Sequence, residues 1–116
     1  MEAFEKLEVW KRGSRLCVDL YRAMGHCRDR GFREQITRSA LSVPSNIAEG
    51  YERNSRPDYV RFLKIAKGSC GELRTQLYIG SEVGLLPREF ALDMVRESVE
   101  ISRILQAMIS KLSEPN

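Results

Sequence analysis

Three things that this 116-residue chain lacks limit what it can be. Its three cysteines are an odd number and form no CxxC pair, so a secretory disulfide framework and a zinc ribbon are both poor interpretations. Its uncharged runs are far shorter than the roughly 20 residues that a membrane span needs. The opening MEAFEKLEVWK is charged from its second residue, unlike a signal peptide. We therefore predict a cytoplasmic protein with no membrane partner.

Residues suited to catalysis are also sparse. The single histidine, His26, stands beside Cys27 in MGHCRDRG, and no second group of ligands follows it. The glycines of GSCGEL lie inside a helical segment rather than after a strand, so they do not form a phosphate loop. Carboxylates are dispersed over helix surfaces. We expect no enzyme activity, no cofactor and no metal.

The overall composition is that of a globular domain. Charged residues make up 30% and hydrophobic residues 42%, and the length favours a single domain over residues 1–116. Lys and Arg number 19 against 16 Asp and Glu, a net charge of +3. This mild excess permits nucleic-acid binding but does not require it.

Helical periodicity dominates the chain, and no segment alternates apolar and polar residues as a strand would. The predicted helices cover about 4–24, 29–53, 57–84 and 88–113. The third is the clearest: it follows a possible cap at Ser55, has Pro57 in its first turn, and ends near Gly84. Short breaks between long helices make neighbours antiparallel. The predicted fold is all-α, an antiparallel up-and-down four-helix bundle.

Residues 42–53, SVPSNIAEGYER, place a proline and a glycine inside the second predicted helix. Pro44 lacks an amide hydrogen and its ring crowds the carbonyl of Ala40, so we predict a Pro-kinked helix or a restart near Ser42. Gly50 has no Cβ and lets another helix approach closely. Residues 68–71, GSCG, are predicted to permit the same approach from the third helix.

A polar stripe also runs along the second helix. Its members are three or four residues apart: Gln35, Arg38, Ser42, Asn46, Glu49 and Arg53. The stripe is either a functional polar surface or the solvated face of an amphipathic helix.

Surplus apolar residues on the third helix leave a similar choice. Phe62, Ile65, Ile79 and Val83 exceed what one bundle seam needs. They indicate either a second buried face, and hence self-association, or a broad core stripe with a few exposed apolar residues.

Two basic groups are candidate nucleic-acid surfaces. The first, on the first helix, contains Lys11, Arg15 and Arg22 near one face, with Arg12 adjacent. The second surrounds the turn after the second helix and contains Arg53, Arg56, Arg61, Lys64 and Lys67. Tyr51 and Tyr59 are interleaved with the second group and could stack on bases of a single strand. The alternative is a solvated mixed-charge surface, because acidic residues interrupt both groups.

The run from Gln35 to Leu77, QITRSALSVPSNIAEGYERNSRPDYVRFLKIAKGSCGELRTQL, resembles the pattern of the 23S rRNA intervening-sequence protein family. The matching positions include Gln35, Arg38, Pro44, Asn46, Glu49, Gly50, Gly68 and Ser69. The opening Phe4, Leu7, Val9, Trp10 and Lys11 also resemble the start of the family pattern. The resemblance covers nearly the whole chain.

The resemblance implies a bacterial, cytoplasmic four-helix bundle without known enzyme activity, assembled as a ring-like pentamer. It also implies nucleic-acid binding, because relatives that accompany reverse transcriptases in diversity-generating retroelements bind nucleic acid through basic surfaces. We therefore expect a homo-oligomer that binds RNA or DNA; the alternative is an assembly scaffold for a protein partner that never contacts nucleic acid. The matching positions are expected to have a structural role, with Pro44, Asn46, Glu49 and Gly50 near an inter-helix or inter-subunit contact.

Overall fold

Four long helices make up the chain, and they begin and end close to the predicted positions. The computed structural model describes residues 3–115. The helices are α1 (Glu8–Ala23), α2 (Arg30–Tyr51), α3 (Arg56–Glu82) and α4 (Arg88–Leu112). The first segment differs from expectation, because residues 4–24 are not one helix: a 3₁₀ turn, η1 (Ala3–Lys6), precedes α1, and another, η2 (Met24–His26), follows it.

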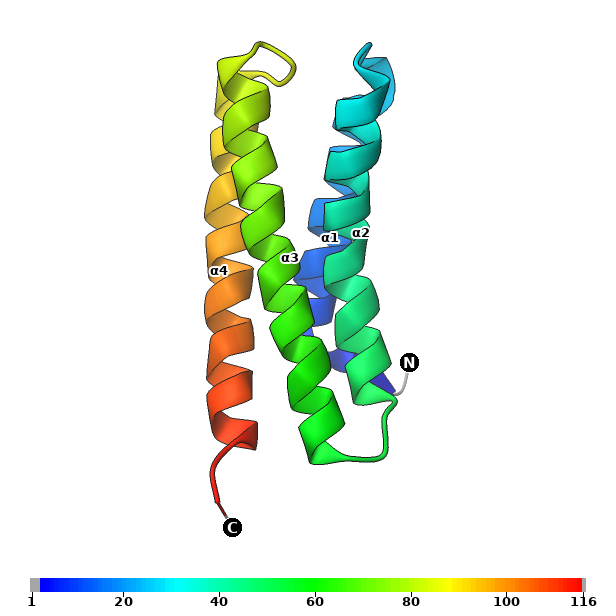
Figure 1. Ribbon diagram of the computed structural model, residues 1–116, viewed down its shortest axis with the longest axis vertical. Coiled ribbons are helices and arrows are strands. Elements are labelled where there is room, and N and C mark those ends of the chain that lie inside the picture. Colours follow the sequence, from blue (N-terminus) through cyan, green and yellow to red (C-terminus); the bar gives the residue numbers. More distant parts are fainter. Residues whose placement is uncertain (1–2, 116) are drawn as a thin grey trace.

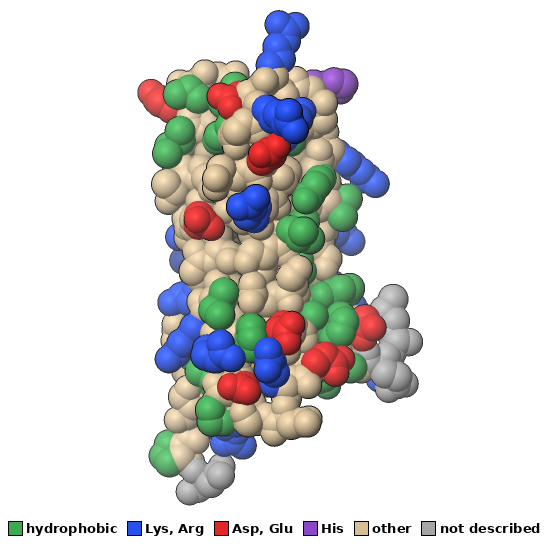
Figure 2. Space-filling model, turned by 45° about the vertical axis from the view of Figure 1, so that its right-hand side comes forward, with side chains coloured by type: hydrophobic (Ala, Val, Ile, Leu, Met, Phe, Trp, Pro, Cys, Tyr) green, Lys and Arg blue, Asp and Glu red, His purple; other side chains and the backbone are tan. Residues whose placement is uncertain are grey.

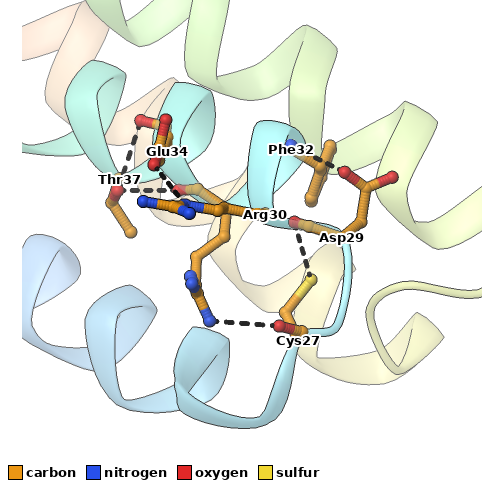
Figure 3. A network of polar contacts seen from close by, with 7 residues as sticks. Cys27, Asp29, Arg30, Phe32, Glu34 and Thr37 are labelled. Atoms are coloured by element: carbon orange, nitrogen blue, oxygen red, sulfur yellow. Dashed lines mark hydrogen bonds and ion pairs between the residues drawn. The ribbon is translucent and has the colours of Figure 1, made fainter.

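The start of α2 is fixed by side chains that satisfy free backbone groups (Figure 3). Asp29 Oδ1 accepts a hydrogen bond from the amide of Phe32 at 2.9 Å, as a helix N-cap does. Arg33 Nη1 donates back to the carbonyl oxygen of Cys27 at 3.2 Å. These bonds set the direction in which the chain leaves η2 and begins its descent along the bundle.

The ends of α3 confirm the predicted capping signals. Ser55 Oγ accepts from the amide of Asp58 at 3.2 Å. At the other end Gly84 has φ +79°, a left-handed conformation that favours glycine. The amide of Leu85 donates to the carbonyl of Gly80 at 2.8 Å and that of Gly84 to Ser81 at 3.2 Å, the two bonds of a Schellman motif.

The helices run alternately up and down (Figure 1). Each packs against two others: α1 and α3 both contact α2 and α4. The predicted all-α four-helix architecture is confirmed, and residues 3–115 contain no strand. Within residues 3–115, twenty buried apolar residues from the four long helices, η2 and the α3–α4 turn form one core, in which Leu20, Ile36, Leu77 and Leu105 are fully inaccessible. No helix within residues 3–115 is long and apolar enough to cross a membrane.

Pro44 lies inside α2, which continues from Arg30 to Tyr51 without interruption. The predicted restart near Ser42 is therefore wrong, while a kink stays a prediction. Pro44 is buried and lies beside Gly13 of α1. A Cβ built on Gly13 would lie 3.3 Å from Val43 Cγ1 and 3.7 Å from Pro44 Cδ. Packing against α1 thus holds the proline inside the helix despite its missing amide hydrogen.

Glycines differ sharply in what surrounds them. A Cβ at Gly50 would lie 2.7 Å from Phe62 Cβ and 3.1 Å from Tyr59 Cδ1, so α2 and α3 approach closely there, as predicted. Gly68 and Gly71 have no heavy atom within 4 Å of a Cβ position. Close approach within this chain therefore does not explain the glycines of residues 68–71, whereas Ser69 between them is buried.

This contrast gives a matched pair of substitutions. Gly50→Ala should lower the free energy of unfolding by about 1–3 kcal/mol, because the methyl group has no room beside Phe62. Gly71→Ala should raise it by about 1 kcal/mol, because alanine is the better helix former and the site is open. Chemical denaturation of both variants checks the signs, and a stabilising Gly50→Ala would contradict the close approach of α2 and α3.

Candidate nucleic-acid interface

The predicted basic group on α1 is largely neutralised by carboxylates. Arg12 donates to both carboxylate oxygens of Glu97 on α4, at 2.8 and 2.7 Å. This hydrogen bonding raises the pKa of the Arg12 guanidinium above its ordinary value. Lys11 Nζ lies 3.7 Å from Glu8 Oε1. The α1–α4 hollow of about 630 Å³ that these side chains share with exposed Arg15 also contains Asp19, so its charges are mixed.

The predicted group around the α2–α3 turn is also partly neutralised. Arg53 pairs with Glu49 at 3.1 Å, and Arg61 pairs with Asp58 at 3.7 Å. Both guanidinium groups lie over the ring of Phe62, 4.9 and 4.5 Å from its centroid. These contacts fix the two arginines against the helix surface.

The two tyrosines of this turn contact each other. Their rings meet edge to face with centroids 5.9 Å apart. Tyr59 is half-buried, and burial raises the pKa of its hydroxyl. Tyr51 stays exposed and is the one of the pair that could stack on a base.

Lys64 and Lys67 occupy a different environment, the groove between α3 and α4. Lys67 Nζ donates to Gln106 Oε1 at 2.8 Å, and Gln106 Nε2 donates to Ser110 Oγ at 3.1 Å. The groove has a volume of about 730 Å³ and is lined by Lys64, Lys67, Gly68, Gln106, Ile109, Ser110 and Ser113. No carboxylate lines it.

Arg74 lies two turns beyond Lys67 on the same side of α3 and was not among the predicted site residues. Its Nε donates to Ser98 Oγ at 3.2 Å and its Nη2 to Ser102 Oγ at 3.1 Å. Within residues 3–115, no carboxylate oxygen lies within 4 Å of Lys64, Lys67 or Arg74. A signal for this surface exists in the sequence: α4 carries a stripe of uncharged polar residues, namely Ser98, Ser102, Gln106, Ser110 and Ser113.

One face of the molecule is drawn in Figure 2, with basic side chains gathered in its lower half among carboxylates and apolar groups. The mixture agrees with the ion pairs described above. Arg56 was predicted in the basic group around the α2–α3 turn. It is exposed at the start of α3 and lines a hollow of about 260 Å³ with Lys111 and Glu114.

The polar stripe of α2 faces α3 in its central part. Ser42 Oγ and Ser69 Oγ are 2.8 Å apart, and Asn46 Nδ2 donates to the carbonyl oxygen and Oγ of Ser42 at 2.8 and 2.9 Å. Ser39 Oγ, one turn away, donates to Glu72 Oε1 at 3.0 Å. The remaining members Gln35, Arg38, Glu49 and Arg53 are exposed. We call the bonded residues Ser39, Ser42, Asn46, Ser69 and Glu72 the α2–α3 polar seam.

The candidate metal ligands and nucleophiles named from the sequence are one histidine and the cysteines. No group of three or more His, Cys, Asp and Glu side chains there could hold a metal ion. His26 is exposed in η2. Cys17 and Cys70 are buried, and burial raises the pKa of both thiols.

The protein is an all-α, four-helix protein. Two of its surface hollows lie between neighbouring helices, one between α1 and α4 and one between α3 and α4. A family model described as 23S rRNA-intervening sequence protein matches residues 5–107, and the chain belongs to that family. The crystal structure of a protein of unknown function from the S23 ribosomal protein family of Bacteroides thetaiotaomicron superimposes with a TM-score of 0.82 at 25% identity, covering 87% of this chain and 97% of that one. None of the curated proteins matches the chain.

The polar seam predicts a large effect from a small change at Asn46. Asn46→Asp keeps the shape but replaces a donor with a negative charge beside two oxygens at 2.8 and 2.9 Å. The free energy of unfolding at neutral pH should fall by about 1–3 kcal/mol. The control Asn54→Asp, at an exposed position in the α2–α3 turn, should change it by less than about 0.5 kcal/mol. Equal effects at the two positions in urea denaturation would show that the seam does not stabilise the fold.

Proposed function

We propose that the protein is a non-enzymatic cytoplasmic homo-oligomer, a pentamer, that binds RNA or DNA through basic surfaces repeated around the assembly. Its place in the 23S rRNA-intervening sequence protein family supports the proposal. The observation that carries it is the pair Lys64 and Lys67, which lie beside a groove without carboxylates. Cations without a carboxylate partner attract phosphate more strongly than the ion-paired arginines of the turn.

Repetition strengthens a weak local surface. Only two lysines line each groove, so one groove alone would bind a polynucleotide weakly. In a closed assembly the same surface recurs on every protomer, and a strand held at one groove meets the next at high effective concentration. The proposal therefore requires self-association as well as the local charge.

The outer surface of α3 supports self-association. Ile79 on α3 is 53% exposed, and Val83, the residue that follows the helix, is 63% exposed. Both present apolar surface to solvent that an isolated bundle does not need. Ile65, on the same side of the helix, is 42% exposed. A pentamer closes through head-to-tail contacts, so this surface would meet a different surface of the neighbouring copy.

The same apolar surface also favours the alternative function, an assembly scaffold for a protein partner without nucleic-acid binding. The two functions predict the same assembly but differ in how it responds to RNA. Measuring the mass of the particle with and without RNA separates them.

Assembly is tested by light scattering on a size-exclusion column. The wild-type protein should elute near five times the 13.3 kDa of one chain. Ile79→Lys should shift the mass towards a single chain, because a charge would have to be buried in the interface. Ala107→Lys, on the outer surface of α4, is the matched control and should leave the mass unchanged. A single-chain mass for the wild type would refute the pentamer.

Nucleic-acid binding is tested by adding a mixed RNA pool to the same experiment at low and high salt. The protein peak should shift with RNA at low salt and return at high salt, because phosphate contacts release counterions. A pentamer that ignores RNA and single-stranded DNA at every salt concentration would favour the scaffold.

A further inference from the structure

We infer that the α3–α4 groove is a binding site for the phosphodiester backbone of a single-stranded nucleic acid, and that Gly68 and Gly71 are free of side chains so that the strand can approach the helix. The inference rests on the proposed function and assigns it to one surface. The groove is lined by residues of α3 and α4, whereas Arg53 and Arg61 of the predicted cluster lie over the ring of Phe62, beside Gly50 of α2.

The charge of the groove is the first argument. Lys64 and Lys67 line it, and Arg74 continues the same row about 10.5 Å further along the helix, at about 1.5 Å per residue. The comparable α1–α4 hollow contains Glu8, Asp19 and Glu97, which would repel an anion. No carboxylate lines the α3–α4 groove, and Glu114 lines a separate hollow with Arg56 and Lys111.

The hydrogen bonds around these cations are the second argument. Gln106 accepts from Lys67, while the hydroxyls of Ser98 and Ser102 accept from Arg74. All three acceptors are uncharged, so they hold the cations in position without cancelling their charge. Ser110 and Ser113 add hydroxyl groups that can donate to phosphate oxygens.

The two glycines are the third argument. Glycine destabilises the interior of a helix relative to alanine, so a glycine there needs a compensating reason. At Gly50 and Gly80 the reason is visible, because a Cβ would lie 2.7 Å from Phe62 and 2.5 Å from Phe32 respectively. At Gly68 and Gly71 the space is empty. Gly68 lines the groove itself. Gly71 is four residues after Lys67 and three before Arg74, a spacing that places it on the same side of α3.

The shape of the groove favours one strand over a duplex. It is an open groove between two neighbouring helices, and a positively charged groove that follows the backbone is the usual way of holding a single strand without reading its sequence. The ligand class is therefore a polynucleotide strand recognised by its phosphates, with weak preference among bases.

Fluorescence anisotropy with a labelled 20-nucleotide oligouridine tests the site directly. The double variant Lys64→Gln, Lys67→Gln should bind at least tenfold more weakly at low salt. The slope of log affinity against log salt should become less steep by about 1.4, since each phosphate contact of a single strand contributes about 0.7. The control Arg96→Gln, Arg103→Gln removes equal charge from the outer surface of α4, where both arginines are ion-paired, and should stay within twofold of the wild type.

Gly68→Leu tests the role of the glycine separately from charge. The variant should unfold at a higher temperature than the wild type, because leucine is the better helix former and the site is open. It should nevertheless lose at least fivefold in affinity, because the side chain fills the groove. If the glycine were needed only for folding, Gly68→Leu would unfold at a lower temperature than the wild type.

The outcomes separate the two claims. A wild-type protein that binds neither RNA nor DNA at low salt refutes the proposed function. If the wild type binds but the lysine pair and Gly68→Leu match it, the groove inference alone is wrong. A Gly68→Leu protein of altered mass would overturn the inference too, because the groove would then be a contact between copies. Tighter binding of a 20-base-pair duplex than of either single strand would refute the preference for one strand.

Discussion

The close approach of α2 to α3 is the constraint on which the other surfaces depend. It is possible because Gly50 has no side chain where α2 passes Phe62 and Tyr59. With Phe62 held at this crossing, Arg53 from the α2–α3 turn and Arg61 from the start of α3 both lie over its ring. The crossing therefore places two arginines of the predicted basic group, Arg53 and Arg61, in intramolecular contacts.

The polar seam extends this contact along the two helices. Ser42 and Ser69 are hydrogen-bonded across the interface. Asn46 Nδ2 donates to both the carbonyl oxygen and the hydroxyl of Ser42. One flank of α3 packs against α2, and another faces α4. On the α4 flank Lys67 donates to Gln106, and Arg74 donates to Ser98 and Ser102. The flank of α3 that packs against α2 thus has a structural role, and the flank that faces α4 is the candidate binding surface.

The sequence predicted the helices well because their signals are local. Ser55 and Gly84 act within a few residues of where they stand, and apolar spacing identifies the buried side of each helix. The predicted restart near Ser42 failed because Pro44 is buried against Gly13 of α1, a contact between distant segments. The break at Leu7 between η1 and α1 lies inside a continuous apolar pattern and gave no signal.

The candidate site was predicted less completely, because charge neutralisation depends on tertiary partners. Arg12 was predicted to be available for phosphate, but in the fold it is hydrogen-bonded to Glu97, which is 85 positions away in the sequence. Lys67 was identified as a basic residue, but its groove also requires Gln106 on another helix, 39 positions away. Arg74 was missed because a lone arginine becomes part of a row only when the register of α3 against α4 is known.

Backbone amide chemical shifts of the intact assembly, recorded during titration with single-stranded RNA, test the central claim most directly. The account predicts that the largest changes fall at Gly68, Gly71 and Ser110, with small changes on α1 and in the α2–α3 turn. Changes concentrated at Lys11 to Arg15, or at Arg53 to Arg61, would contradict the assignment of the strand to the α3–α4 groove.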